Sequence, residues 1–417
     1  MPTINWLNQW NDFLDSHPIL QIPEGDVFKL PADVQPSADN EQFWEDLLFY
    51  YPPSTRPINL NNGAVSTSPL IVEKAFTYYY SLLNSSPSYY TWKVMETGRE
   101  VVRSGLAHLI GATADEISIH RNATESLNNA IFGIPLSSGD EVVVCKQDYL
   151  KTVSSWNQRA LREGIVLQWV QLTGSENDDE IISKYVSLFG PKTKVLNLTH
   201  MINWNGRILP VEPIIREAKA RGILVILDAA HSFGVLDIDV SKLQVDYLGT
   251  ALHKWLSGPI PSGMLYVRKE LIGNTWPLAS AVNPTSDNVR KFEELSIQLM
   301  PNILGLGFAI EFHLRLGRAE KEARLRHIRK FWVDEVKDKD YISFKTPFKE
   351  NNCLVIVNML LKGWEPLDLE KKLLTDFGIH VSAVTWENMK GIRVTPNLYT
   401  LKKDLLTFVS AIQQLRI

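Results

Sequence analysis

Two kinds of hydrophobic spacing alternate along most of the chain. Short apolar runs, typical of buried strands, occur at residues 116–120, 140–145, 165–172, 192–200, 223–232 and 263–270. Segments with apolar residues at helical spacing predict amphipathic helices at residues 71–84, 92–111, 124–134, 153–164 and 211–222. Apolar strands that alternate with helices predict an α/β fold, with a mostly parallel sheet covered by helices on both faces.

The pattern changes toward both ends of the chain. After about Trp276, short strand-like runs and a final helical segment predict a smaller α+β domain, whereas the first stretch is rich in Trp, Pro and Asp and carries only short helical patterns. A chain of 417 residues also exceeds what one hydrophobic core usually supports. We therefore predict an N-terminal arm over residues 1–58, a large α/β domain over 59–300 and a small C-terminal domain over 301–417.

Composition narrows the class of partner. The 47 acidic and 43 basic side chains give a formal net charge of −4 without a long block of one sign, which argues against binding of nucleic acid or a membrane surface. Only Cys145 and Cys353 are present, too few for a disulfide framework or a four-cysteine metal site. The first residues do not resemble a signal peptide, and no apolar run is long enough to span a membrane. We expect a cytoplasmic protein that acts on a small molecule and has no metal site.

Two reactive side chains follow predicted strands. Asp228 ends the apolar part of the run 223–232, and Lys254 comes 26 residues later, after the strand-like segment 245–250. Ligands of open parallel sheets bind at the carboxyl ends of the strands, so the two side chains can face one ligand. Taken singly, the aspartate could cap a helix or a turn and the lysine could lie on the surface.

A third element lies in "RNATESLNNAIFGI", residues 121–134. A strand ends at His120, a polar turn follows, and Thr124 opens a helix whose free N–H groups suit a phosphate, although Thr124 could simply be an N-cap. Together the lysine, the aspartate and the helix start match the needs of pyridoxal phosphate. Its aldehyde forms a Schiff base with an amine, its pyridine nitrogen needs an acidic partner, and its phosphate needs N–H donors.

Several motifs carry a family resemblance, in the order "LNNGAVSTSP", "RNATESLNNA", "LNLTHMINWNGRILPVEPI", "DAAHSFG", "HKWLSGPIPSG" and "IRVTPNLYT". From about Leu60 to the C-terminus the chain resembles the class V aminotransferase family of fold-type I pyridoxal-phosphate enzymes, which includes cysteine desulfurases. Within that family it is most similar to the branch named after isopenicillin N epimerase. The resemblance implies a fold-type I transferase, pyridoxal 5'-phosphate as the cofactor, an amino-acid substrate and a homodimer.

The resemblance also implies roles for single residues. Lys254 corresponds to the Schiff-base lysine and Asp228 to the partner of the pyridine nitrogen. The phosphate is expected to bind Ala123 and Thr124 at the helix start and His253 beside the lysine. Asn203 and His231, in two other motifs, are expected to contact the phenolic oxygen of the cofactor.

Some positions depart from the family pattern. Ala251 stands where a serine or asparagine is usual, so a phosphate contact there depends on Thr250. In "FEELSIQLMPN" the usual Gly-Thr is replaced, and Ser296 is expected to donate its hydroxyl to the phosphate bound by the neighbouring subunit. Tyr149 is expected to cover the cofactor ring, although Gln147 or Asp148 could occupy that position, and Tyr149 could equally serve in packing.

Substrate binding is assigned to two residues. Arg393, in "GIRVTPNLY", presents a planar fork that binds a carboxylate through two hydrogen bonds, and the resemblance places the substrate arginine there. An isolated strand arginine would more often form a surface ion pair. Asn62, in the first motif, is the second expected substrate contact.

The groups around Lys254 decide the reaction. Once an amino acid replaces Lys254 on the cofactor, the free amine can remove the α-proton, and the resulting carbanion can lead to epimerisation, loss of a β-substituent or transamination. Residues 381–391 contain no cysteine and Cys353 lies in an apolar run, which disfavours a desulfurase that forms a persulfide. The expected function is therefore a pyridoxal-phosphate enzyme acting at the α- or β-carbon of an amino acid. The alternatives are a carbon–sulfur lyase resembling cysteine desulfurases and a non-catalytic descendant of the fold. A dinucleotide-binding protein is disfavoured, because no G-x-G-x-x-G loop follows a predicted strand.

Overall fold

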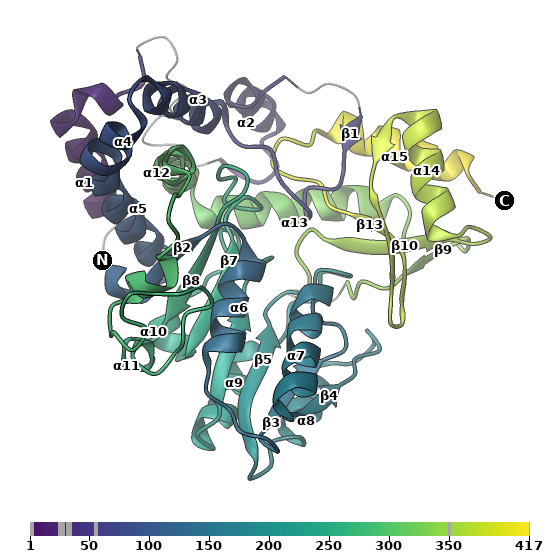
Figure 1. Ribbon diagram of the computed structural model, residues 1–417. Coiled ribbons are helices and arrows are strands. Elements are labelled where there is room, and N and C mark those ends of the chain that lie inside the picture. Colours follow the sequence, from purple (N-terminus) through teal and green to yellow (C-terminus); the bar gives the residue numbers. More distant parts are fainter. Residues whose placement is uncertain (1–3, 24–29, 31–35, 54–56, 349–351, 417) are drawn as a thin grey trace.

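A twisted sheet of seven strands forms the centre of the computed structural model, which describes residues 4–23, 30, 36–53, 57–348 and 352–416 (Figure 1). Its strand order is β2-β8-β7-β6-β5-β3-β4, and all neighbours pair in parallel except β8, which is antiparallel to β7 and β2. The strands are β2 (Ile117–His120), β3 (Glu141–Cys145), β4 (Val166–Val170), β5 (Thr193–Thr199), β6 (Leu224–Asp228), β7 (Tyr247–Ala251) and β8 (Gly263–Val267). The predicted α/β fold with a mostly parallel sheet is confirmed.

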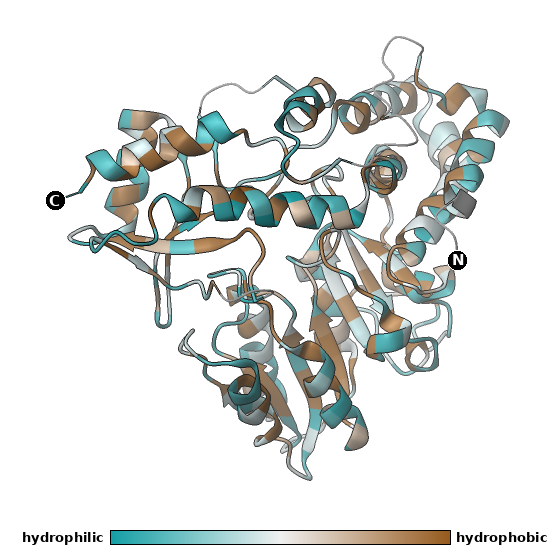
Figure 2. Cartoon of the chain, turned by 180° about the vertical axis from the view of Figure 1, so that it is seen from behind, coloured by the Kyte–Doolittle hydropathy of each residue, from teal (hydrophilic) through white to brown (hydrophobic). Residues whose placement is uncertain are grey.

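Helices cover both faces of this sheet. Because side chains alternate along a strand, Ile226 packs with Leu127 and Trp156 on one face, whereas Val225 and its neighbours pack on the other. The first face is covered by α6 (Ala123–Gly133) and α7 (Leu150–Glu163), the second by α8 (Asp178–Val186) and α9 (Val211–Ala220). Figure 2 shows the resulting contrast between hydrophobic strands and helices with hydrophilic outer sides.

The C-terminal part contains a second sheet, antiparallel and in the order β12-β13-β10-β9. Its elements are α13 (Arg318–Asp334), β9 (Ile342–Phe344), β10 (Val357–Leu361), α14 (Pro366–Phe377), β12 (Ser382–Trp386), β13 (Met389–Val394) and α15 (Lys402–Gln414). A short parallel pair, β1 (Ile58–Asn59) with β11 (Ile379–His380), ties it to the loop that precedes the large sheet. This smaller antiparallel layer agrees with the α+β pattern predicted for the C-terminal part.

The N-terminal helices pack on one side of the large sheet. Trp10 is fully buried and its ring contacts Phe308 edge-on at 5.3 Å, and an added Cβ at Gly307 would come within 2.3 Å of that indole. The helices involved are α1 (Ile4–Ser16), α2 (Glu41–Asp46), α3 (Leu70–Ser85), α4 (Pro87–Tyr89), α5 (Glu96–His108) and α12 (Met300–Leu316); two short helices, α10 (Val240–Leu243) and α11 (Lys269–Ile272), complete the large part. The predicted boundary between residues 300 and 301 assigns α12 to the C-terminal domain, whereas α12 packs chiefly on α3 and α5 of the preceding part. The position of this boundary therefore stays a prediction.

Within the described residues, no helix combines the length and apolar character that crossing a membrane requires.

Candidate active site

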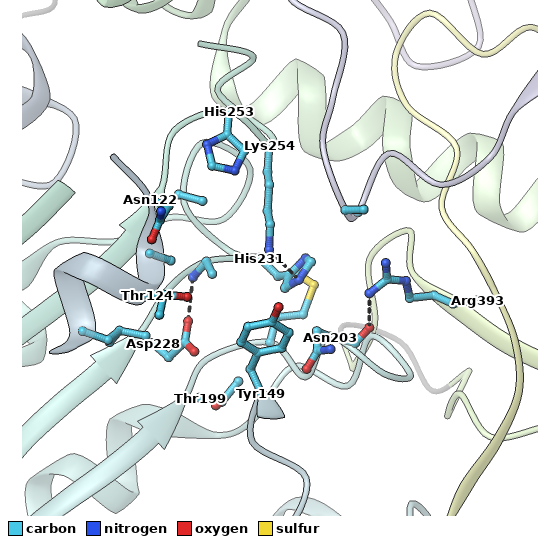
Figure 3. Close-up of a pocket in the computed structure, with 17 residues that line it drawn as sticks. Asn122, Thr124, Tyr149, Thr199, Asn203, Asp228, His231, His253, Lys254 and Arg393 are labelled. Atoms are coloured by element: carbon cyan, nitrogen blue, oxygen red, sulfur yellow. Dashed lines mark hydrogen bonds between the residues drawn. The ribbon is translucent and has the colours of Figure 1, made fainter. Parts of the chain in front are cut away.

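A cavity of about 270 Å³ opens at the carboxyl ends of β5, β6 and β7 (Figure 3). It receives side chains from the helix start of α6, from the loop after β7 and from β13 of the smaller sheet. The lining residues are Gly63, Ala64, Asn122, Ala123, Thr124, Leu127, Tyr149, Thr199, Met201, Asn203, Asp228, Ala230, His231, Ala251, His253, Lys254 and Arg393. The topology therefore brings most of the predicted site residues to one place.

Lys254 extends into this cavity from the loop between β7 and β8. Its Nζ lies 3.0 Å from Nε2 of His231. Burial lowers the pKa of the Lys254 amine to about 8, opposed by the Asp228 carboxylate and reinforced by Arg393. Burial also moves the pKa of His231 well below its usual range, helped by the charges of Lys254 and Arg393. A neutral His231 can accept a hydrogen bond from Lys254 through Nε2, and the lowered pKa of the amine increases the fraction of the unprotonated form that attacks an aldehyde.

Asp228 ends β6 and lies opposite Thr199 in the register of the two parallel strands. Its Oδ1 accepts a 2.9 Å hydrogen bond from the backbone N–H of Ala230. Burial raises the pKa of the Asp228 carboxyl, while that hydrogen bond and Lys254 oppose the change. No salt bridge to Asp228 occurs among the described residues. A buried carboxylate of this kind suits a cationic N–H partner, such as a protonated pyridine nitrogen.

The helix α6 supplies backbone donors at the opposite side of the cavity. It begins at Ala123 rather than at the expected Thr124, because Asn122 is the N-cap and its side chain accepts from the N–H of Glu125 at 2.9 Å. The N–H groups of Ala123 and Thr124, in the first turn, have no helical acceptor. His253 also lines the cavity; its Nδ1 lies close to the backbone of Ser262, which leaves Nε2 as the free polar atom of the ring. These groups form a cradle suited to an anion.

Arg393 reaches the cavity from β13. It is 8 % exposed, and its guanidinium donates to the backbone oxygen of Asn203 at 3.2 Å and to Oδ1 of Asn61 at 3.1 Å, while its Nε has no partner. Burial lowers the pKa of Arg393 to about 10, and Tyr149 opposes the change. Within the described part of the chain no carboxylate pairs with this guanidinium. A buried, uncompensated arginine is a site for a carboxylate ligand.

These groups fit pyridoxal phosphate and an amino acid. The Lys254 amine can bond to an aldehyde, Asp228 can bind a ring N–H, and the start of α6 can hold a phosphate. Two buried polar atoms in the set have no protein partner, Nδ1 of His231 and Nε of Arg393. Since buried polar atoms are normally hydrogen-bonded, their state indicates that a polar ligand completes the site.

Three candidates for the ring position are separated by the fold. Tyr149 lines the cavity, and its ring centroid lies 6.3 Å from Trp204. Gln147 instead donates to Asn388 at 3.0 Å, and Asp148 is buried beneath the strand ends. Of the three, only Tyr149 is placed where a cofactor ring could lie against it.

The question raised by Ala251 is also decided by position. Ala251 lines the cavity, whereas the hydroxyl of Thr250 donates to the backbone oxygen of Ala229 at 3.1 Å. Thr250 therefore does not take over the missing phosphate contact.

Asn62 is not brought into the cavity. Its Nδ2 donates at 3.0 Å to the backbone oxygens of Asn59 and Thr395, and its Oδ1 accepts from the hydroxyl of Tyr399 at 2.7 Å. With its amide occupied in this way, Asn62 fastens the loop to the residue that follows β13, and the expected substrate contact is not available. The neighbouring Asn61, which sequence reasoning missed, holds Arg393 instead.

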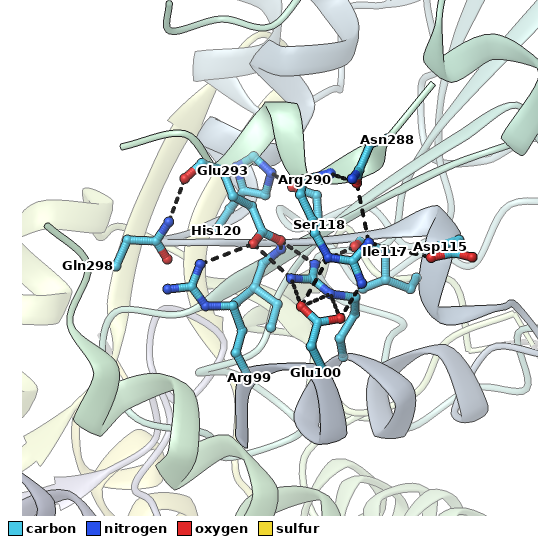
Figure 4. Close-up of polar contacts among 12 residues, drawn as sticks. Arg99, Glu100, Asp115, Ile117, Ser118, His120, Asn288, Arg290, Glu293 and Gln298 are labelled. Atoms are coloured by element: carbon cyan, nitrogen blue, oxygen red, sulfur yellow. Dashed lines mark hydrogen bonds and ion pairs between the residues drawn. The ribbon is translucent and has the colours of Figure 1, made fainter. Parts of the chain in front are cut away.

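Ser296 also lies outside the cavity, on an exposed segment between a 3-10 turn (Val289–Glu293) and α12. The base of this segment is held by a buried ion-pair network (Figure 4). Arg103 and Glu293 are buried at its centre, with 3.0 Å between Nη2 and Oε2, and Glu100 links Arg103 to Arg290 at the rim. Ser296 itself is exposed, so the structure does not bring it to the cavity of its own chain.

Both cysteines are unsuited to forming a persulfide. Cys145 and Cys353 are buried, neither lines the cavity, and burial raises the pKa of each thiol. A reactive cysteine needs access and a stabilised thiolate. The hairpin of β12 and β13 carries no thiol and is fastened by Trp386, whose ring stacks on Trp204 at 5.8 Å.

Comparisons with known proteins identify relatives that match most of the chain. The isopenicillin N epimerase of Streptomyces clavuligerus is 24% identical over 376 residues, covering 86% of this chain and 94% of that protein. The probable cysteine desulfurase 2 of Mycobacterium leprae (strain TN) is 27% identical, covering 77% of this chain and 80% of that protein.

Among solved structures, a complex of the cystine C-S lyase C-DES with cysteine persulfide matches with a TM-score of 0.79 and 21% identity, covering 87% of this chain and 99% of that one. The cysteine desulfurase CsdA of Escherichia coli matches with a TM-score of 0.79 and 20% identity, covering 89% and 98% of the two chains. At this identity the likeness concerns the fold. The family model described as aminotransferase class-V matches residues 58–400, and the chain therefore belongs to the class V aminotransferase family of pyridoxal-phosphate-dependent enzymes.

Proposed function

We propose that Lys254 carries pyridoxal phosphate and that the enzyme changes bonds at the α- or β-carbon of an amino acid bound by Arg393. The observation that carries this proposal is the meeting of three groups in one cavity: the amine of Lys254, the buried carboxylate of Asp228 and the uncompensated guanidinium of Arg393. A non-catalytic descendant of the fold would have no use for this costly combination of buried charges.

The cofactor, when bound, supplies an electron sink for the pair of electrons left on the α-carbon. Asp228 holds the proton on the ring nitrogen, because a buried carboxylate favours a cationic partner. The N–H groups of Ala123 and Thr124, with Nε2 of His253, hold the phosphate. We assign the phenolic oxygen to Asn203, through its side-chain amide, and to His231, through its unpartnered nitrogen.

The remaining groups act on the substrate. Arg393 binds the substrate carboxylate through two parallel hydrogen bonds. This contact holds the α-carbon and its proton on the side of the cavity where Lys254 lies. The amine of Lys254 would act as the base that removes the α-proton, and its lowered pKa of about 8 suits this role near neutral pH. Tyr149, which lines the cavity, would lie against one face of the ring and shield it from water.

Epimerisation, transamination and elimination of a β-substituent are all compatible with these groups. Two relatives are named for epimerase and cysteine desulfurase activities, and one structural neighbour is a cystine C-S lyase. The burial of Cys145 and Cys353 disfavours a desulfurase that passes sulfur to its own thiol. We therefore propose the epimerase-like branch, with a lyase that needs no cysteine as the second candidate.

We also propose that the enzyme is a cytoplasmic homodimer with Ser296 directed at the neighbouring subunit. Apolar side chains surround this serine on the surface: Ile297 is 71% exposed and Leu299 is 43% exposed. An exposed apolar segment on a rigidly held base is a feature of a protein interface. The division into residues 1–58, 59–300 and 301–417 is part of the same proposal.

Reconstitution with pyridoxal phosphate tests the proposed function. We expect a visible absorbance band, and borohydride reduction followed by peptide mapping should place the label on Lys254. A panel of amino acids with chiral and keto-acid detection then separates epimerisation from transamination and elimination. A label on another lysine, or none after reconstitution, would refute the assignment.

A further inference from the structure

A second buried lysine lies next to the backbone of Lys254. Lys321, on α13, is 5% exposed, and its Nζ donates a 2.6 Å hydrogen bond to the backbone oxygen of Trp255, the residue that follows Lys254. The same Nζ lies 3.1 Å from Nδ1 of His313, near the C-terminal end of α12. When the amine is protonated it can only donate, so His313 then accepts through Nδ1 and carries its proton on Nε2. Two helices and the loop after β7 thus meet at one nitrogen.

Packing alone does not explain this lysine. Within the described residues Lys321 has no ion pair, and burial lowers the pKa of its amine to about 7. The charged or titratable groups around it are His313 on α12, whose pKa burial and Lys321 move well below its usual range, and Arg318 on α13, which acts on the same histidine. Taking an uncompensated amine out of water costs stability that an apolar side chain of similar length would not cost.

The loop that Lys321 holds is a tight turn. The N–H of Ser257 donates to the oxygen of Lys254 at 3.0 Å, and the N–H of Gly258 donates to the oxygen of Leu252 at 2.9 Å. Ser257 has a φ of 59°, a left-handed conformation that costs a non-glycine residue free energy and persists where the surroundings enforce it. The bond from Lys321 to Trp255 lies in the middle of this turn and fixes it from α13.

We propose that Lys321, with His313 as its acceptor, is a positioning residue that fixes the backbone after Lys254 and so keeps the Lys254 amine aligned with His231. The inference rests on the proposed role of Lys254. Through this hydrogen bond, α13 of the C-terminal part directly supports the backbone next to the reactive lysine. Arg393, which comes from the same part of the chain, is not involved in this contact.

The test compares Lys321→Met with Lys330→Met, a lysine of the same helix whose side chain is 71% exposed. In the protein without added cofactor, hydrogen–deuterium exchange at residues 252–258 should be faster by about fivefold or more in Lys321→Met, because the turn loses its outer support. With cofactor and an amino acid found active in the panel, kcat should fall by about tenfold, while KM stays within about twofold because Arg393 is untouched.

Exchange and kcat values for Lys321→Met that equal those of Lys330→Met would overturn the inference. If Lys321→Met does not fold, His313→Leu replaces it: removal of the acceptor should produce the same changes to a smaller extent, and unchanged exchange and kcat would again overturn the inference. Borohydride labelling of the unsubstituted protein separates this result from the proposed function. Absence of a label on Lys254 refutes that function, whereas the exchange experiment decides independently whether Lys321 holds the turn.

Discussion

The hydroxyl of Thr199 donates a 2.6 Å hydrogen bond to the buried carboxylate of Asp148. Thr199 lines the cavity and lies opposite Asp228 on the neighbouring strand, so the bond joins a carboxylate beneath the cavity to its wall. Asp148 also accepts from the N–H of Cys145 and from Asn197, each at 3.0 Å. Two buried carboxyl groups, Asp148 and Asp228, therefore influence each other below the position proposed for the cofactor ring.

The first prediction concerns the pH dependence set by Asp148. Burial raises the pKa of this carboxyl to about 7, opposed by the Thr199 hydroxyl and the Cys145 N–H and reinforced by Asp228. Because the folded-state pKa lies above the ordinary value of 3.8, the folded state binds the proton more tightly than the unfolded state. The free energy of unfolding should therefore decrease as the pH rises from about 4 to about 7, by up to roughly 1.4 kcal/mol per pH unit from this group.

Asp148→Asn should remove that component. Chemical denaturation of the protein without cofactor, measured at several pH values, checks it. The substitution also places an amide N–H against groups that donate to Asp148, so we expect a loss of about 1–3 kcal/mol at low pH. An unchanged slope between pH 4 and 7 would show that Asp148 is ionised throughout.

A second prediction separates cofactor chemistry from cofactor attachment. Asp228→Asn removes the charge that keeps the ring nitrogen protonated, so activity should fall steeply, by about a hundredfold or more. The link to Lys254 should still form, and the protein should stay coloured. Asp237→Asn, a change of an exposed aspartate, is the matched control. Full activity in Asp228→Asn would place the partner of the ring nitrogen elsewhere.

Arg393→Lys provides a third prediction, about substrate binding. Lysine keeps the positive charge but loses the planar fork, so the affinity for an amino acid should weaken by roughly 2–4 kcal/mol. Titration with the amino acid, followed by the change in visible absorbance, measures this affinity, while borohydride labelling of Lys254 should be unaffected. Arg162→Lys, at an exposed ion pair, serves as the control. Equal affinity in Arg393→Lys and the parent would mean that the carboxylate binds at another group.

The fourth prediction tests the subunit boundary. An obligate dimer should bury more than roughly 2,000 Å² in total, and sedimentation should show a single species of twice the chain mass. Ile297→Asp should shift this species toward the monomer, because it places a charge in the apolar contact. Ser296→Ala should leave the dimer intact but weaken phosphate retention by about 1 kcal/mol. A parent protein that sediments as a monomer at micromolar concentration contradicts the boundary.

Local patterns in the sequence were sufficient for the strands and for the residues that follow them directly. Apolar runs predicted β5, β6 and β7, and Asp228 and Lys254 lie at the carboxyl ends where such runs stop. The start of α6 was predicted to within one residue, because Asn122 rather than Thr124 caps the helix. Polar residues next to buried strands can be predicted from the sequence, because a run of apolar residues indicates a buried strand whichever distant segments pack against it.

Contacts between distant segments were decided by the tertiary structure alone. The chain places Asn62 and Asn61 side by side, yet only packing against β13 and the residue after it determines that Asn62 bonds to Thr395 while Asn61 holds Arg393. The same is true of Lys321, which looks like any helical lysine until α13 brings it to Trp255, 66 residues away. Periodicity reports which face of an element is buried, whereas the direction of a single hydrogen bond depends on how two elements pack across the whole fold.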